Sequence, residues 1–263
     1  MRIAMTRGVS PALARCELAF LPRVALDAGR ARDQHREYER ALRDLGCTVV
    51  SVAADPALPD CVFIEDVALV LDEVAVLLRP GAPSRRPEAA AVAEALAVYR
   101  PLRWIAEPAT IDGGDVLRIG RTLFVGRSNR TSDAGAAALA AAVAPFGYDV
   151  RGVTVTGCLH LKSAVTQVGP DTVLVNAAWM GTEPLAGMRR VEVDPAEPHA
   201  ANALWLGGDV IYPASFPRTR RRLEAAGIAV VPVDVSELQK AEGAVTCCSL
   251  VFNRVSAAAP PSS

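Results

Sequence analysis

Two adjacent cysteines near the end of the sequence are the first residues whose type could do chemistry. Cys247 and Cys248 lie in the apolar stretch EGAVTCCSLVF and could be a packing pair, metal ligands, or a nucleophile with its neighbour. Neighbouring cysteines rarely form a disulfide, because the bridge strains the backbone between them. The chain contains no C-x-x-C motif and, at 263 residues, needs no disulfide scaffold. We therefore expect both side chains to be free thiols.

Three histidines are the candidates for a general acid or base. His35 lies in the charged stretch ARDQHREYERALRDLG, which predicts a helix with His35 on its solvated face. His199 follows a proline in the predicted loop EPHAAN. His160, in CLHLKSAV, is predicted at the start of a strand, where an unpaired imidazole is costly to bury. Taken alone, His160 is best explained as a core residue, but its place in the repeat described below favours catalysis.

Acidic residues stand before two strongly apolar runs. The stretch PDCVFIEDVALV carries Asp60, Glu65 and Asp66, and TIDGGDVL carries Asp112 and Asp115. Each could cap a turn by itself. Carboxylates that converge on one pocket raise each other's pKa unless a cation neutralises them, and a planar guanidinium matches carboxylate geometry with paired hydrogen bonds. If these residues converge, they predict a guanidinium-bearing ligand.

A cysteine and a histidine beside such a ligand narrow the chemistry. A thiolate attacks the electron-poor guanidinium carbon more readily than water does, and a covalent intermediate divides the substitution into two easier steps. A thiol beside a protonated imidazole and a bound cation is biased towards its thiolate form. The imidazole can protonate the departing amine and then deprotonate the attacking water.

A recurring pattern of hairpin, arginine-bearing loop and helix is expected to position these residues. It appears over residues 63–96 and 111–143, as a hairpin over 160–176, in shorter form over 204–227, and as a beginning at 246–255. The residues that precede the apolar runs are aligned as Asp66, Asp115, Ser163, Asp209 and Cys248, at unequal intervals of 39 to 49 residues. Units of this kind stack as blades and bring their starts towards one axis.

A doubly wound α/β fold is the alternative architecture, in which GGD marks ordinary turns. The sequence favours the bladed fold, because G-G-D lacks the G-x-G-x-x-G spacing and each GGD precedes a strand, not a helix.

Six motifs carry a family resemblance: FIEDVALV, RPGAPSRR, DGGDVL, FVGRSNRT, LHLKS and EGAVTCCS. In this order they resemble the dimethylarginine dimethylaminohydrolase family of the guanidino-group modifying, or pentein, superfamily, over about residues 6 to 255. The resemblance implies an α/β fold, a five-bladed α/β propeller with pseudo-fivefold symmetry. It also implies conversion of asymmetric dimethylarginine or monomethylarginine and water to citrulline and an alkylamine, through a cysteine thiouronium intermediate and without a cofactor or metal.

The resemblance also assigns roles to individual residues. Cys247 matches the nucleophile, His160 the general acid and base, and Asp66 and Asp112 the acidic groups around the guanidinium and the histidine. The substrate-binding positions are matched by Leu18, Asp60, Glu65, Asp66, Arg85, Arg130, Ala241 and Glu242. Among them, Arg85 and Arg130 match the arginines that hold the substrate carboxylate, and Leu18 lies where the family has a mobile lid. Ala241 would contribute only its backbone carbonyl.

Other functions are considered beside this one. An arginine deiminase, which releases ammonia from unmethylated arginine, belongs to the same superfamily but usually carries a helical insertion for which this chain has no room. A zinc-binding or thiol-redox module is disfavoured, because adjacent cysteines do not easily ligate one tetrahedral ion. A non-catalytic member of the fold is disfavoured by the intact set of cysteine, histidine and acidic residues.

Composition limits the partners and the location. The net charge is −1 and no basic block interleaves with aromatic residues, so no nucleic acid is expected. No apolar stretch reaches the roughly 20 residues that span a bilayer, and MRIAMTRGVS lacks a signal-peptide core, so we expect a cytoplasmic protein. We expect residues 1–257 to form one catalytic domain and 258–263 a short disordered tail. The expected partners are a small-molecule substrate, a methylated arginine, and a second copy of the chain in a homodimer.

Overall fold

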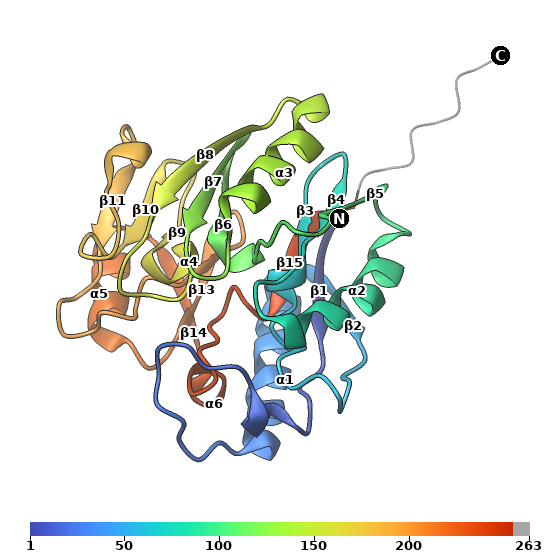
Figure 1. Cartoon of the computed structure of the whole chain (residues 1–263). Coiled ribbons are helices and arrows are strands. Elements are labelled where there is room, and N and C mark those ends of the chain that lie inside the picture. The colour runs from blue at the N-terminus through green and yellow to red at the C-terminus, as the bar shows by residue number, and fades with distance from the viewer. Residues whose placement is uncertain (255–263) are drawn as a thin grey trace.

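The computed structural model describes residues 1–254, which form five three-stranded sheets around a common centre (Figure 1). The five-bladed α/β propeller predicted from the sequence is confirmed, although the lengths of the helices differ from blade to blade. Every sheet has the same construction. Its first two strands pair antiparallel, as a hairpin in four of the sheets, and a third strand runs parallel to the second after a crossover connection.

The first four blades follow one another along the chain. Their strands, in order, are β3 (Ala68–Val70), β4 (Ala75–Leu77) and β5 (Leu102–Trp104); β6 (Val116–Ile119), β7 (Thr122–Arg127) and β8 (Asp149–Thr154); β9 (Val165–Gln167), β10 (Thr172–Val175) and β11 (Arg189–Glu192); β12 (Leu204–Trp205), β13 (Asp209–Pro213) and β14 (Ala229–Val233). The hairpin turns predicted at Asp72-Glu73, Gly120-Arg121 and Gly169-Pro170-Asp171 lie between the first and second strands of their blades.

Both ends of the described chain build the fifth blade. The strand β15 (Ser249–Asn253) pairs antiparallel with β1 (Arg2–Arg7), which pairs parallel with β2 (Cys47–Val52). The apolar run after the cysteine doublet therefore forms the first strand of this blade, and its antiparallel partner is the strand at the beginning of the chain. This pairing completes the ring of blades, with β1 in the middle of its sheet and β15 at one edge.

Helices cover the outer sides of the blades where the crossovers allow it (Figure 1). They are α1 (Ala28–Asp44), α2 (Ala89–Leu96), α3 (Asp133–Val143) and α5 (Pro217–Ala225), with two single-turn helices, α4 (Leu161–Ala164) and α6 (Ser236–Gln239), near the centre. Ser132 caps α3 as predicted, because its hydroxyl accepts a hydrogen bond from Gly135 N at 3.0 Å. The crossover of the third blade has only a 3-10 turn, Glu183–Leu185.

The alignment of the repeat is wrong in the fourth blade. Asp209 begins the second strand, β13, and the preceding Gly207-Gly208 forms the hairpin turn, closed by a hydrogen bond from Leu206 N to Asp209 O. The first strand, β12, begins at Leu204, and Asn202 and Ala203 are the residues that precede it. The two GGD tripeptides therefore have different roles, since the one at 113–115 forms a 3-10 turn before β6.

His35 also differs from its prediction. The helix α1 forms as expected, but the imidazole of His35 is buried and packs beside the ring of Tyr38. Burial lowers the pKa of His35, against the opposing charge of Glu39. The charged stretch thus hides one apolar stripe that faces the fifth blade, and His35 belongs to that stripe.

No helix within residues 1–254 is long and apolar enough to span a bilayer. The predicted domain boundary and the tail at 258–263 lie outside the described residues.

Candidate active site

One narrow cavity collects residues from the starts of several blades. It is lined by Glu17, Asp60, Phe63, Asp66, Arg85, Asp112, Arg130, Leu159, His160, Ala241, Glu242, Gly243 and Cys247. Asp66 lies just before β3, Asp112 before β6, His160 before α4, and Cys247 before β15. Since the first strands of all blades surround the centre, residues that are far apart in sequence meet at one end of them.

Two glycines permit this convergence. A Cβ atom on Gly113 would lie 1.9 Å from the backbone oxygen of Glu65, and one on Gly114 would lie 2.5 Å from Nδ1 of His160. Both distances are impossible for packed atoms, so any side chain at either position would push the blades apart. The DGGD motif is therefore a point of close backbone approach beside the histidine.

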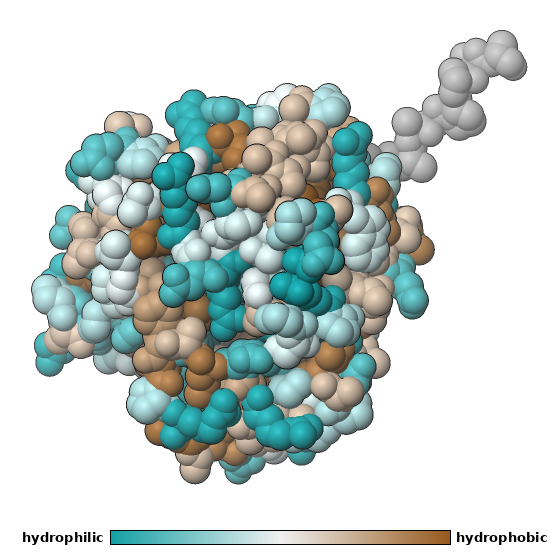
Figure 2. All heavy atoms as spheres, viewed as in Figure 1, coloured by the Kyte–Doolittle hydropathy of each residue, from teal (hydrophilic) through white to brown (hydrophobic). Residues whose placement is uncertain are grey.

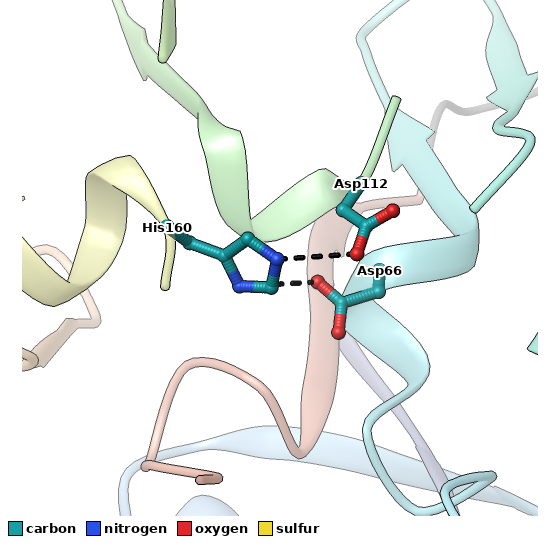
Figure 3. Close-up of side chains that lie close together, drawn as sticks. All are labelled: Asp66, Asp112 and His160. Carbon is teal, nitrogen blue, oxygen red and sulfur yellow. Dashed lines mark hydrogen bonds and ion pairs between the residues drawn. The ribbon is translucent and has the colours of Figure 1, made fainter. Parts of the chain in front are cut away.

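His160 lies between two carboxylates that come from different blades (Figure 3). Its Nε2 lies 3.1 Å from Oδ2 of Asp112, and its Nδ1 lies 3.9 Å from Oδ1 of Asp66. The sequence predicted His160 at the start of a strand. In the structure it is instead the N-cap residue of α4. Burial disfavours a charged imidazole, but Asp66, Asp115 and Asp112 outweigh this effect and raise the pKa of His160 to about 9. The imidazole is thus protonated at neutral pH and can act as an acid.

Asp66 is held in its ionised form by several donors. Its Oδ2 accepts a 2.6 Å bond from Nη1 of Arg85, and its Oδ1 accepts one from Gly114 N at 2.9 Å. Burial would raise the pKa of this carboxyl, but Arg85, His160 and the Gly114 N–H lower it to about 2. Arg85 is itself buried and also binds Glu88 Oε2 at 2.9 Å. Its guanidinium therefore fixes the wall of the cavity.

The two cysteines have different surroundings. Cys247 is partly exposed and lines the cavity, whereas Cys248 is fully buried and its Sγ lies 3.3 Å from Ala244 O. Burial raises the pKa of the Cys247 thiol to about 12, and the nearby carboxylates Glu65 and Asp66 add to that effect. The sequence predicted a bias towards thiolate. In this structure the chain by itself keeps the thiol protonated at neutral pH.

A loop covers the cavity. Residues 16–27, here called the lid loop, contain no helix or strand. The carboxylate of Asp60 accepts from Glu17 N at 3.1 Å, and that of Glu242 accepts from Ala19, Phe20 and Leu21. Apolar side chains gather on the surface where this loop lies (Figure 2), and Phe20 and Val24 are about half exposed. Two acidic residues at the cavity rim thus hold the loop by its backbone.

Comparison with known proteins identifies the family. No protein-family model matches the sequence. The chain is 41% identical over 249 residues to N(G),N(G)-dimethylarginine dimethylaminohydrolase of Streptomyces coelicolor, covering 94% of this chain and 95% of that protein. The protein of the same name from Pseudomonas aeruginosa is 32% identical over 228 residues, with 86% and 90% covered. The chain belongs to the dimethylarginine dimethylaminohydrolase family.

Solved structures of the dimethylarginine dimethylaminohydrolase family share the whole fold. A cysteine-to-serine variant of the Pseudomonas aeruginosa enzyme, complexed with citrulline, superposes with a TM-score of 0.90 at 30% identity and covers 95% of this chain and 98% of its own. A histidine-to-glycine variant bearing an S-methyl-L-thiocitrulline adduct gives the same TM-score, with 96% and 100% covered. The N-terminal domain of ArgZ, a cyanobacterial arginine dihydrolase, shares the fold at 18% identity and a TM-score of 0.82.

Most of the residues predicted for a dimethylarginine dimethylaminohydrolase site lie around the cavity. Leu18 and Glu65 do not line it. Leu18 is half-buried in the lid loop and packs against the core beside α1. Both carboxylate oxygens of Glu65 are bound within the protein, Oε1 by Lys162 Nζ at 2.5 Å and Oε2 by the Thr246 hydroxyl at 2.7 Å. The substrate roles of these two residues remain predictions.

Sequence reasoning noticed Asp115 but gave it no role in the site. Its Oδ1 accepts from Leu161 N at 2.9 Å, and its Oδ2 accepts from the Ser128 and Thr131 hydroxyls at 2.5 and 2.6 Å. Asp115 therefore orients the first turn of α4, which carries His160 at its cap. The signal was its position before an apolar run in the repeat, the same position as Asp66.

Lys162, Glu88 and Asn202 were missed. Each supports a residue of the site: Lys162 pairs with Glu65, Glu88 pairs with Arg85, and Asn202 donates to Thr246 Oγ1 at 3.0 Å. Only the three-dimensional contacts reveal these roles.

The group formed by Asp66, Asp112 and His160 brings its ligand atoms within 4.8 Å of one another. Ion pairs within the protein account for this closeness, since Arg85 and Gly114 bind Asp66 while Asp112 binds His160. We assign no metal to the group, and the absence of a metal stays a prediction.

Glu242 is expected to hold the lid loop closed. Its backbone has a φ of 59°, which disfavours most side chains, so Glu242→Gly relieves the backbone while removing the carboxylate. Loss of the charged acceptor should raise the amide hydrogen exchange of residues 19–21 by about tenfold or more. The amides of β10 serve as the internal reference. Unchanged exchange at residues 19–21 would show that the carboxylate does not hold the loop.

Proposed function

We propose that this protein hydrolyses asymmetric dimethylarginine and monomethylarginine to citrulline and an alkylamine. The observation that carries the proposal is the cavity that Cys247 and His160 share with the carboxylates Asp66 and Asp112. A nucleophile, a protonated acid and anionic groups for a cation meet there. The family and the citrulline complex of its Pseudomonas aeruginosa member support the same reaction.

The substrate would lie with its guanidinium at Cys247 and its amino-acid end towards the lid loop. Within residues 1–254, the Arg130 guanidinium makes no recorded ion pair or hydrogen bond, and Arg130 lines the cavity. It is therefore the better placed of the two predicted arginines to take the substrate carboxylate, with Arg85 behind it. The cavity has a volume of ≈ 20 Å³, which suits about one water molecule. Entry of the substrate must therefore displace the lid loop.

The cationic substrate supplies the positive charge that the Cys247 thiol needs in order to ionise. Burial and the carboxylates Glu65 and Asp66 raise the pKa of Cys247 to about 12. A guanidinium bound among these carboxylates offsets their charge and stabilises the thiolate, so the thiol releases its proton to solvent and the nucleophile forms when the substrate binds. This arrangement protects the thiol from other reactions between turnovers.

In the first half-reaction, the Cys247 thiolate attacks the guanidinium carbon and forms a carbon–sulfur bond. The bond from that carbon to the methylated nitrogen then breaks. His160, protonated because its pKa is raised to about 9, gives its proton to the departing amine. A cationic thiouronium intermediate remains on Cys247.

In the second half-reaction, water takes the place of the amine. His160, now neutral, accepts a proton from the water as its oxygen attacks the same carbon. The carbon–sulfur bond breaks and Cys247 leaves as thiolate. The second proton of the attacking water passes to solvent, which leaves the neutral ureido group of citrulline with the oxygen from water. Asp112, 3.1 Å from His160 Nε2, and Asp66 stabilise the imidazolium in both halves.

An assay of the ureido product across arginine, monomethylarginine, asymmetric dimethylarginine and agmatine tests the proposed function; the product is citrulline from the first three and carbamoylputrescine from agmatine. We expect the two methylated arginines to be turned over with the highest kcat/KM and the amine to appear in equal amount. A preference for arginine with release of ammonia would instead assign the protein as an arginine deiminase. No ureido product from any of the four compounds would contradict hydrolysis at this site.

Arg130→Ala tests the proposed carboxylate contact. Loss of one charge-assisted contact, about 2 kcal/mol, should raise the KM for dimethylarginine about 30-fold with a smaller change in kcat. Agmatine has no carboxylate, so any activity towards it should hardly change. Arg127→Ala is the matched control, because Arg127 ends β7 just before the loop that carries Arg130 but is exposed and pairs with Asp133. An equal rise in KM in Arg130→Ala and Arg127→Ala would contradict a contact between Arg130 and the substrate carboxylate.

A further inference from the structure

Four residues from four blades form a closed hydrogen-bonded ring at the centre of the propeller, and a residue of the remaining blade, Gly113, is bound to it through Lys162. Each stands just before the first strand of its blade: Glu65, Gly113, Lys162, Asn202 and Thr246. Lys162 Nζ binds Glu65 Oε1 at 2.5 Å and Gly113 O at 3.1 Å. Asn202 Nδ2 binds Lys162 O at 3.1 Å and Thr246 Oγ1 at 3.0 Å, and the Thr246 hydroxyl binds Glu65 Oε2 at 2.7 Å.

The ring separates two cavities. The catalytic cavity is lined by none of Glu65, Lys162 and Thr246, whereas a second cavity of ≈ 250 Å³ is lined by all three. This second cavity runs among the first strands of all five blades, β3, β6, β9, β12 and β15. The ring is therefore the floor between the catalytic cavity and a central channel.

The ring lies against the backbone of the nucleophile. Glu65 N donates to Cys247 O at 3.2 Å, and Thr246 is the residue before Cys247. The side chains of Glu65 and Lys162 are only 10% and 15% exposed, so their charges are poorly screened by solvent. A buried carboxylate and a buried ammonium each need the other, because either alone would pay the full cost of desolvation.

We propose that Glu65 and Lys162 form a positioning pair that sets, from the channel side, how readily Cys247 becomes the nucleophile. The carboxylate opposes formation of the thiolate and the ammonium favours it. The pair acts through its field and through the backbone of residues 246–247, and neither member lines the catalytic cavity. This role differs from the substrate contact predicted for Glu65 and gives Lys162 its first role. It rests on the proposed function only in taking Cys247 as the nucleophile.

Other charged and titratable groups also face Cys247. Glu65, Asp66 and Lys162 are the charged groups that act on its thiol, and Cys248 and Tyr38 adjoin it. The catalytic cavity adds Glu17, Asp60, Arg85, Asp112, Arg130, His160 and Glu242. All of them stay unchanged in variants of the pair, so the shift caused by each variant reports the pair alone.

Alkylation of Cys247 by iodoacetamide tests the proposal without any substrate. At a fixed pH near 8 the rate follows the thiolate fraction, and modification of the peptide that contains Cys247 is followed by mass spectrometry. Glu65→Gln should speed alkylation by about threefold to tenfold, and Lys162→Met should slow it by about the same factor. The double variant, Glu65→Gln with Lys162→Met, carries neither charge and should be alkylated faster than the native chain. The reason is that the Glu65 carboxylate raises the pKa of the Cys247 thiol more than the Lys162 ammonium lowers it.

Opposite signs separate this role from a structural one. A ring that only supports the fold would give changes of the same direction in both single variants, and that result, or no change in either, overturns the proposal. If Lys162→Met does not fold, Glu65→Gln still decides, because it must speed alkylation without faster amide hydrogen exchange at residues 246–249; faster exchange there would assign the effect to lost structure and overturn the proposal. Arg121→Met is the matched control: it removes the cation of an exposed 2.6 Å pair with Glu73 and should leave the rate unchanged. Since no turnover is measured, failure here is distinct from failure of the proposed function.

Discussion

Cys247→Ser is expected to lower kcat for citrulline formation by about 10⁴-fold or more, while Cys248→Ser keeps most of the activity. A serine hydroxyl at position 247 stays protonated in a buried site that already opposes ionisation of a thiol. The Cys248 side chain lies on the other side of the strand start, fully buried, with its Sγ 3.3 Å from Ala244 O. A serine there can donate to the same oxygen, so the cost falls mainly on stability, at about 1 kcal/mol.

A citrulline assay and thermal unfolding of both variants check this prediction. The two substitutions are chemically identical and one residue apart, so each is the control for the other. If Cys248→Ser were inactive and Cys247→Ser active, Cys248 would be the nucleophile and the assignment of Cys247 would be wrong. If Cys247→Ser lost activity only because the protein unfolds, as a large fall in Tm would show, the catalytic role of Cys247 would also be contradicted.

His160→Gly is expected to lower kcat by about 10²- to 10⁴-fold, because the amine then leaves without a proton donor and water attacks without a base. The pH profile gives a sharper signature. His160 is protonated below its pKa of about 9, so kcat at saturating substrate, where the bound guanidinium has already stabilised the Cys247 thiolate, should fall as pH rises through about 9. The variant has no such group and should lack this alkaline fall.

Added imidazole is the control for His160→Gly. The glycine leaves a space between Asp112 and Asp66, and free imidazole in that space should restore part of the rate. His199→Gly is a matched variant on an exposed loop residue that stacks on Trp179, and it should keep the native pH profile. Native rates in His160→Gly, or an alkaline fall that persists there, would contradict the assignment.

Much of the fold could be predicted from local sequence patterns. The turns at Asp72-Glu73 and Gly120-Arg121 and the Ser132 cap depend on neighbouring residues, so short-range rules located them. The fourth blade shows the limit of those rules. GGD at 207–209 and GGD at 113–115 are the same tripeptide, yet one is a hairpin turn and the other a 3-10 turn, because strand pairing decides the difference.

The sequence by itself determined the chemistry. A cysteine doublet, a histidine and acidic residues before apolar runs specify a guanidinium site, because reactivity belongs to residue types and the repeat sends those positions to one axis. The tertiary structure alone decided how each residue is used. Arg85 is committed to Asp66 and Glu88, and Glu65 is committed to Lys162 and Thr246.

The state of the thiol was also decided by the tertiary structure. Burial and the carboxylates of Glu65 and Asp66 keep Cys247 protonated, where the sequence predicted a bias towards thiolate. The physical reason is common to all these cases. Burial and polar contacts join residues separated by 19 to 181 positions, and no local pattern records which partner a buried charge finds.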